Sequence, residues 1–196
     1  MAHSVSASAS DYCQSMTQLL RQLDYAAIDA YAQLLFDAWQ QQRRILVFGN
    51  GGSAFTAAHH VLDYAKTAAV PGQRRLQAIS LVDNIGLTTA IGNDVSYDDT
   101  FRYPLETFAA PGDIAVAISC SGNSPNVIAA CEWARQNGVT VVALTGFSGG
   151  KLTTLADLHI NVSSDNYGIV EDLHMSIGHI VAQILQQRVR KVASAA

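Results

Sequence analysis

Apolar residues follow two spacings along the chain, and their alternation predicts the order of the elements. Short apolar runs typical of buried strands occupy 45–48, 76–81, 114–118, 139–144 and 158–162. Apolar positions recur every three to four residues, as in helices, at 53–66, 84–90, 97–109, 124–137 and 169–192. Strands that alternate with helices in this way indicate an α/β fold with a five-stranded, mostly parallel sheet covered on both faces.

The N-terminal region has a different pattern. Residues 1–10 are small and polar, which predicts a disordered tail followed by a single domain over 11–196. From Asp11 to about Arg43, helical spacing predicts one long helix or two helices broken near Asp24. Its apolar face is wider than one core-facing stripe needs. We therefore expect it to pack on a partner subunit, while cover of the chain's own sheet remains the alternative.

Composition narrows the class of protein. Hydrophobic residues make up 49% and charged residues only 14%, so we expect other subunits to cover part of the exterior. A net charge of −4, with no extended lysine or arginine cluster, argues against a nucleic-acid-binding surface. No apolar run approaches the length of about 18 residues that a membrane helix requires, and none resembles a signal peptide. The three cysteines lack CxxC spacing, so we expect reduced thiols in a cytoplasmic protein.

Two loops rich in small polar residues follow predicted strands. GNGGS (49–53) leads into a helix whose predicted N-cap is Ser53, and its free backbone N–H groups suit an anion or a polar sugar. It does not fit GxGxxG, because Ala54 stands at the third glycine position. SCSGNS (119–124) offers three hydroxyls and several amides before a second helix, as a phosphomonoester requires where no lysine is present. The alternative is an ordinary loop with Ser121 or Ser124 as N-cap.

Two helices carry the candidate catalytic and metal-binding side chains. His59 and Asp63 are four residues apart, so they share a helix face and could hold a divalent metal, or they could be an ordinary surface pair. His60 points elsewhere and is interpreted as structural. The last helix carries two acids and two histidines among apolar residues, which are unfavourable to bury unless paired or ligating: Glu171, Asp172, His174 and His179. Glu171 and His179 are too far apart along a straight helix to share one metal, unless the first turn is bent or two subunits contribute.

Several motifs together carry a family resemblance. They are GNGGSA (49–54), His59-xxx-Asp63, IGND (91–94), SCSGNSPNVIAA (119–130), LTGFSGG (144–150) and EDLHMSIGHIV (171–181). Their order and spacing resemble the sugar isomerase (SIS) domain of the phosphoheptose isomerase family over residues 11–190. This resemblance implies a three-layer αβα sandwich of SIS, flavodoxin-like type. It also implies a homotetramer, with the N-terminal helices serving oligomerisation, and no nucleic-acid or membrane partner.

The resemblance also implies a reaction and its residues. The family interconverts sedoheptulose 7-phosphate and glycero-manno-heptose 7-phosphate, with a zinc ion in each subunit. By position, the catalytic pair is Asp63 and His179, and the metal positions are His59, Asp63, Glu171 and His179. The substrate-binding positions are Asn50, Gly51, Gly52, Ser53, Asn93, Asp94, Ser119, Cys120, Ser121, Ser124 and Glu171. We expect Asp63 to act as the base that forms an enediol and His179 as the complementary acid.

Three positions depart from the family pattern. The usual glutamate is Asp63, the usual glutamine is Glu171, and an arginine four residues after the acid is Thr67. These departures favour the alternative of a non-catalytic SIS module that senses a phosphosugar or binds a protein, as replication-initiator-associating proteins do. The simultaneous presence of an acid, histidines and a serine loop opposes it. An isomerase for another phosphosugar, or for a nucleotide-linked or antibiotic heptose, is a third possibility.

Overall fold

The computed structural model describes residues 4–195 of the chain. The strands are β1 (Arg44–Gly49), β2 (Gln77–Ser80), β3 (Ile114–Ser119), β4 (Thr140–Gly146) and β5 (Leu158–Val162). The helices are α1 (Ala9–Gln22), α2 (Tyr25–Gln41), α3 (Gly52–Leu62), α4 (Ile85–Asp94), α5 (Arg102–Phe108), α6 (Pro125–Gln136), α7 (Leu152–Leu155) and α8 (Tyr167–Ala195). A π-helical turn, η1 (Asp63–Thr67), follows α3, and a 3₁₀ turn, η2 (Tyr97–Asp99), precedes α5.

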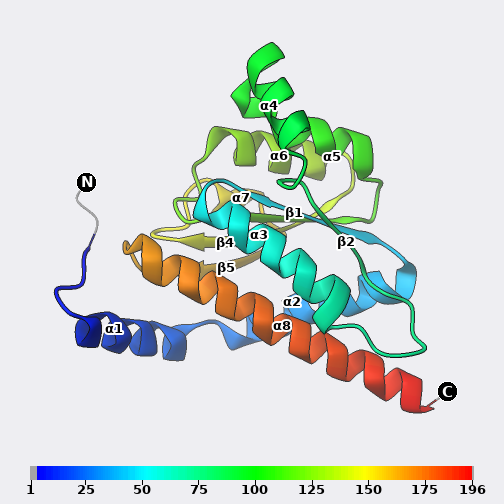
Figure 1. The fold of residues 1–196 in the computed structure, drawn as a ribbon, viewed down its shortest axis with the longest axis horizontal. Coiled ribbons are helices and arrows are strands. Elements are labelled where there is room, and N and C mark those ends of the chain that lie inside the picture. Colours follow the sequence, from blue (N-terminus) through cyan, green and yellow to red (C-terminus); the bar gives the residue numbers. More distant parts are fainter. Residues whose placement is uncertain (1–3, 196) are drawn as a thin grey trace.

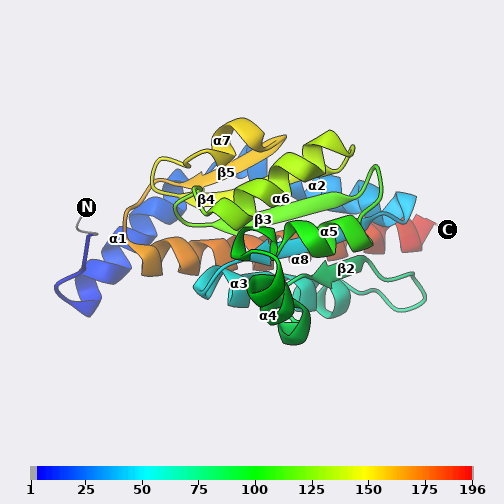
Figure 2. The same cartoon turned by 90° about the horizontal axis from the view of Figure 1, so that it is seen from above.

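The five strands form one parallel sheet in the order β2-β1-β3-β4-β5. Alternate residues of each strand enter two separate cores, because successive side chains of a strand point to opposite faces. Ile45 and Val47 join the core that α2, α3 and α8 complete, whereas Leu46 and Phe48 join the core that α5, α6 and α7 complete. The predicted three-layer αβα sandwich with a parallel sheet is confirmed (Figure 1). Seen from above, α5 and α6 lie over the strands (Figure 2).

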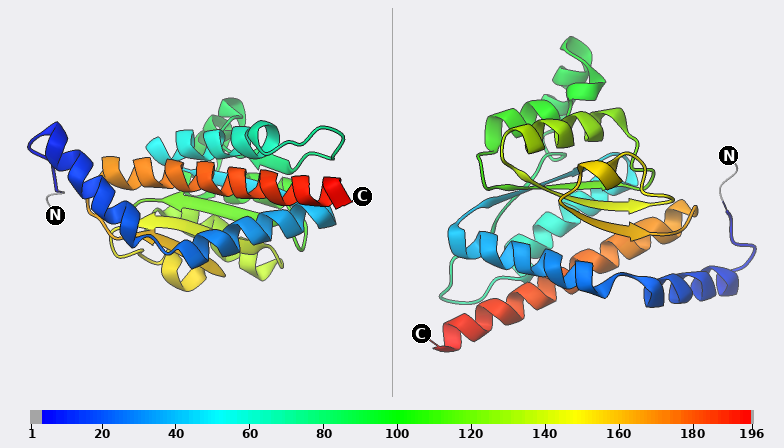
Figure 3. Two further views of the ribbon diagram at one scale, coloured as in Figure 1. Left: turned by 90° about the horizontal axis from the view of Figure 1, so that it is seen from below. Right: turned by 180° about the vertical axis from the view of Figure 1, so that it is seen from behind.

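The N-terminal region consists of two helices, as one of the two sequence alternatives predicted. Asp24 separates them and caps the second, because its Oδ1 accepts a hydrogen bond from the Ala27 N–H at 2.9 Å. The first helix begins at Ala9, with Ser8 as its N-cap, so it includes the last two residues of the predicted tail. Residues 1–3 of that tail lie outside the described residues. Helix α1 projects beyond the sheet, on the same side of the molecule as α2 and α8 (Figure 3).

Three predicted helices differ from the structure in their bounds. Gly51, not Ser53, is the N-cap of α3, because its backbone takes φ 55° and ψ −123°, a conformation open to glycine. The chain therefore enters the helix early and Ser53 is buried in its first turn. The helix predicted at 84–90 continues to Asp94 as α4, and the Ile91 carbonyl accepts from the Val95 N–H at 2.9 Å at its end. The helix expected at 97–109 is divided into η2 and α5.

Candidate functional site

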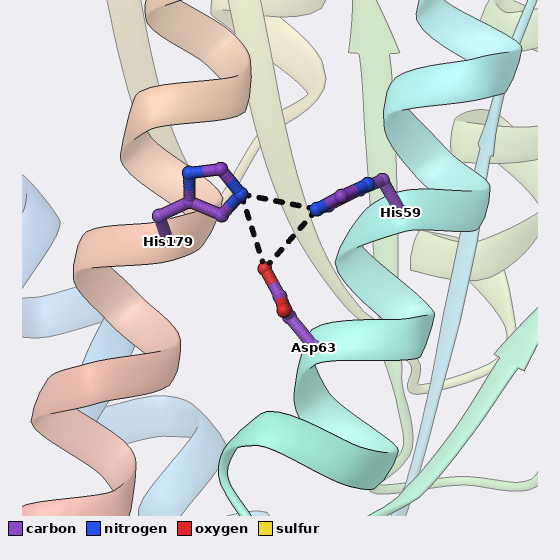
Figure 4. Close-up of side chains that lie close together, drawn as sticks. All are labelled: His59, Asp63 and His179. Carbon is purple, nitrogen blue, oxygen red and sulfur yellow. Dashed lines mark hydrogen bonds and ion pairs between the residues drawn. The ribbon is translucent and has the colours of Figure 1, made fainter.

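Three of the predicted catalytic and metal-binding side chains converge between α3 and α8 (Figure 4). His59 lies on α3, Asp63 begins η1, and His179 comes from α8. The Nε2 atoms of the two histidines are 3.0 Å apart. Asp63 Oδ2 lies 3.6 Å from His59 Nε2 and 3.4 Å from His179 Nε2. We call His59, Asp63 and His179 the His-Asp-His cluster.

Close packing of α3 against α8 brings the cluster together. His60, next to His59, is fully buried, and its Nε2 donates to the His174 carbonyl at 3.0 Å. Gly178, next to His179, lies against the His60 ring, and a Cβ at this position would overlap that ring. Glycine at 178 therefore permits the helix approach that places His179 beside Asp63. The interpretation of His60 as structural is confirmed.

The cluster fits a divalent cation. Four tetrahedral ligands, each about 2.0–2.1 Å from a zinc ion, are about 3.3 Å from one another. The three separations observed in the cluster, 3.0, 3.4 and 3.6 Å, bracket that value. Asp63 Oδ2 is also a buried oxygen without a hydrogen-bond donor, which is unfavourable unless another group satisfies it. The Asp63 side chain is 7% exposed, whereas His59 and His179 are 41% and 47% exposed, so the cluster opens to solvent on one side.

A second site lies at the carboxyl ends of β1 and β3. It is a cavity of about 150 Å³, which we call the serine pocket, and its lining comes from three segments of the chain, 50–53, 119–124 and 167–171. The lining residues are Asn50, Ser53, Ser119, Cys120, Ser121, Ser124, Tyr167 and Glu171. Every position predicted for the phosphate, 119, 120, 121 and 124, is among them. Ligands bind at this end of the strands in open parallel α/β sheets.

The serine pocket presents hydroxyl and N–H groups. Ser124 stands at the N-cap of α6 but makes no side-chain capping hydrogen bond, so its hydroxyl is free to contact a ligand. Its Oγ is 3.4 Å from Ser119 Oγ. The N-terminus of α6 adds a positive dipole end. Among the described lining residues there is no lysine or arginine, so hydroxyls and the helix end would have to hold an anion.

The next loop braces the serine loop. Gly146 N–H donates to the Cys120 carbonyl at 2.8 Å, and Leu152 N–H donates to the Gly122 carbonyl at 3.2 Å. The side chain of Asn123 joins the two loops as well, because its Oδ1 accepts from the Lys151 N–H at 3.0 Å. The loop is therefore held in place without a ligand, and its geometry is preorganised.

Two ionisable side chains of the pocket have shifted pKa values. Burial raises the pKa of the Cys120 thiol to about 11, although the Ser53 hydroxyl at 3.9 Å opposes the shift. Cys120 is therefore a neutral thiol at physiological pH and not a nucleophile. Burial, and secondarily the charge of Asp172, raises the pKa of Glu171.

The structure separates Glu171 from the His-Asp-His cluster. The Glu171 carboxylate lines the serine pocket and lies against Gly52, in the space that a Cβ at this glycine would occupy. Among the described residues, the group able to hold a metal comprises His59, Asp63 and His179 without Glu171. Asn93 and Asp94 are exposed at the end of α4, which stands away from the sheet, and they do not line the pocket (Figures 1 and 3). Gly51 does not line the serine pocket either.

Sequence reasoning missed Asn126, which supports the serine pocket, and named Thr67, which supports the His-Asp-His cluster, only as a departure from the family pattern. Asn126, in the first turn of α6, exchanges two hydrogen bonds with Asn50, at 2.8 and 2.9 Å, and also donates to Thr100 Oγ1 at 3.0 Å. Thr67 Oγ1 donates to Asp63 Oδ1 at 2.7 Å. Asn126 follows Pro125 inside the quoted motif, but no spacing rule pairs it with a residue 76 positions earlier.

Comparisons with known proteins agree with this geometry. The SIS domain family matches residues 11–146. A phosphoheptose isomerase of Geobacter sp. (strain M21) is 37% identical and covers 95% of this chain and 96% of its own length. The lincomycin biosynthesis protein LmbN of Streptomyces lincolnensis is 40% identical over 78% of this chain and 59% of its own length. The solved structure of phosphoheptose isomerase GmhA from Neisseria gonorrhoeae superposes with a TM-score of 0.82 at 29% identity, over 91% of this chain and 94% of that one.

The fold and the serine pocket define an α/β protein of the SIS class, whose family match spans more than half of the chain. Within that class, the chain belongs to the phosphoheptose isomerase family. Among the described residues, no helix is both long and apolar enough to cross a membrane.

Proposed function

We propose that the protein is an aldose–ketose isomerase that interconverts sedoheptulose 7-phosphate and D-glycero-D-manno-heptose 7-phosphate through an enediol. The observation that carries the proposal is the presence, in one subunit, of a carboxylate beside an imidazole and of a serine pocket with a helix N-terminus. Relatives named phosphoheptose isomerase along nearly the whole chain support it. They do not favour a non-catalytic binding module.

The chemistry divides between two side chains. Asp63 removes the proton from C1 of the ketose, which gives the enediol, and returns a proton to C2 to form the aldose. His179 moves a proton between the two oxygens, because O1 loses one and O2 gains one in this direction. The two groups are adjacent, with Asp63 Oδ2 and His179 Nε2 3.4 Å apart. The serine pocket would hold the phosphate and so fix the reacting carbons relative to both groups.

We propose zinc as the cation of the His-Asp-His cluster. Two imidazole nitrogens and a carboxylate oxygen are donors that suit zinc. His59, Asp63 and His179 would hold it, and it would supply stabilisation of negative charge on the substrate oxygens. Asp63 and His179 belong to the His-Asp-His cluster and are also the proposed base and acid. The proposed cation would therefore lie next to the atoms that react.

We propose a cytoplasmic homotetramer. Exposed apolar side chains support an oligomer, since Phe55 on α3 is 81% exposed and Ile85 on α4 is 73% exposed. A groove of about 1040 Å³ between α1 and the segment 163–166 contains none of the predicted site residues, so another subunit could pack there without covering the site. Three free cysteines support a reducing compartment. Light scattering tests the assembly, and a monomer would contradict it.

The function is tested by solvent deuterium exchange. The protein is incubated with sedoheptulose 7-phosphate in deuterium oxide, with and without added zinc, and label in the aldose product is read by mass spectrometry. We expect deuterium at C2 of the aldose. Asp63→Asn removes the base and is expected to lower the exchange rate by about 10³-fold, while phosphosugar binding persists. Retained turnover in Asp63→Asn would reject the assignment of the base.

A further inference from the structure

The two carboxylate oxygens of Asp63 have different surroundings. Oδ1 accepts a hydrogen bond of 2.7 Å from Thr67 Oγ1. Oδ2 is buried, has no hydrogen-bond donor, and faces the Nε2 atoms of His59 and His179. One oxygen is thus held by the protein, and the other is directed at the site.

Thr67 owes its position to the π-helical turn η1. The turn is closed by a hydrogen bond of 2.8 Å from the Ala68 N–H to the Asp63 carbonyl, five residues earlier. Asp63 and Thr67 are its first and last residues, so the turn places the threonine hydroxyl within hydrogen-bond distance of the Asp63 carboxylate.

The turn is also tied to α8. Gln186 Nε2 donates to the Thr67 carbonyl at 2.6 Å. Gln186 and His179 are seven residues apart, close to two turns of an α-helix, so they share one face of α8. The helix that supplies His179 therefore also fixes the residue that holds Asp63.

We propose that Thr67 is a positioning residue that orients the Asp63 carboxylate, so that Oδ1 stays hydrogen-bonded and Oδ2 faces His59 and His179. The torsion of a carboxylate about its last bond has a broad energy profile, so packing leaves the oxygen positions poorly defined. A short hydrogen bond to a charged acceptor is about twice as strong as a neutral one and removes that freedom. This inference rests on the proposed function.

Removal of the hydroxyl alone tests the inference. Thr67→Val keeps the branched shape but loses the donor, and Thr67→Ser keeps the donor but loses the methyl group. The matched control is Thr107→Val on α5, whose hydroxyl donates to the carbonyl of Tyr103 in its own helix. Each variant is compared with the wild type in the exchange assay, in thermal unfolding and in zinc titration of metal-stripped protein against a chromophoric chelator.

We expect Thr67→Val to lower kcat by about 10- to 100-fold and to weaken zinc binding about 10-fold, the range for loss of a bond that orients a ligand. KM should change by less than about twofold, because the serine pocket is untouched. Thr67→Ser should recover most of both properties. A merely structural role would instead lower the unfolding temperature of both Thr67 variants alike.

The two readouts separate failure of this inference from failure of the proposed function. If the wild type exchanges deuterium and Thr67→Val matches it in kcat and zinc affinity, the positioning role is overturned. If the wild type binds zinc but exchanges no label with sedoheptulose 7-phosphate, the proposed function fails, and zinc affinity alone decides the role of Thr67. If the wild type does neither, both are overturned.

Discussion

The His-Asp-His cluster and the serine pocket are built by opposite strategies. The serine pocket is local, because four of its residues come from one loop between β3 and α6, and neighbouring backbone groups brace that loop. The cluster is non-local, because His59 and His179 are 120 residues apart and meet where α3 packs against α8. A short stretch of chain therefore encodes half of the lining of the first site, whereas the packing of two helices encodes the whole of the second.

The largest effect is expected at Gly178, where α8 packs closely against α3. Gly178→Ala places a methyl group in the volume of the buried His60 ring, so α8 must move away from α3. A displacement of about 1 Å at reacting groups can lower a rate by about 100-fold, and we expect a loss of kcat of that size with weakened zinc binding. Phosphosugar binding, measured by calorimetry, should fall less than kcat, because half of the lining of the serine pocket lies at 119–124, outside α3 and α8.

The control for Gly178→Ala is Gly86→Ala. Gly86 also lies in a helix, α4, but the nearest atom to an added Cβ is Asn84 Oδ1 at 3.6 Å, an ordinary contact. Wild-type kcat and zinc affinity in Gly178→Ala would show that the approach of α3 to α8 does not set the cluster.

The difference between local and non-local construction explains which parts of the structure could be predicted from the sequence. The strands and the serine loop were predicted because buried apolar runs and glycine-rich turns are local signals. The motif placed His59 and Asp63 on one helix face, but spacing could not show that a π turn begins at Asp63 or that Thr67 would donate to it. Nor could spacing place Glu171, whose side chain turns toward Gly52 and the serine pocket through tertiary packing.

A smaller effect is expected at Glu171, and it tests whether this residue belongs to the serine pocket or to the His-Asp-His cluster. Its carboxylate lines a pocket without a described lysine or arginine, so it repels a bound phosphate. Glu171→Gln keeps the shape and removes the charge, and we expect KM for the phosphosugar to fall by about threefold to tenfold, or about 1 kcal/mol. Zinc affinity should stay within about twofold, since the structure separates Glu171 from the cluster.

Asp172→Asn is the matched control for Glu171→Gln. Asp172 is the next residue, but its Oδ2 accepts from the Tyr12 hydroxyl of α1 at 2.6 Å, so its charge serves another contact. It should change KM less than Glu171→Gln does, because Asp172 does not line the pocket. Glu171→Ala tests the family position directly, because Glu171→Gln keeps an oxygen that can bind a metal. If Glu171→Ala weakens zinc binding about 10-fold or more, Glu171 is a metal ligand in the working protein.

The last effect is on stability rather than on activity and concerns His174, near the start of α8, which is hydrogen-bonded to both β4 and α3. Its Nε2 donates to the Thr145 carbonyl on β4 at 3.0 Å, and its own carbonyl accepts from His60 on α3 at 3.0 Å. Burial lowers the pKa of His174 to about 4, and its Nδ1 is a buried atom without a partner. Protonation would therefore place an uncompensated charge between the sheet and α8.

The sign of the pH dependence follows from this pKa. Between pH 6.5 and about 4 the unfolded chain binds a proton at His174 and the native protein does not, so stability falls as the pH falls through this window. The contribution of one such histidine is about 1 kcal/mol per pH unit. Urea unfolding at pH 7, 6 and 5, at constant protein concentration, should show a shallower dependence for His174→Gln than for the wild type. Equal pH dependences of the two proteins would mean that the His174 ring binds its proton in the native state as easily as in the unfolded chain. The hydrogen bonds of His174 to β4 and α3 would then not hold α8 in place.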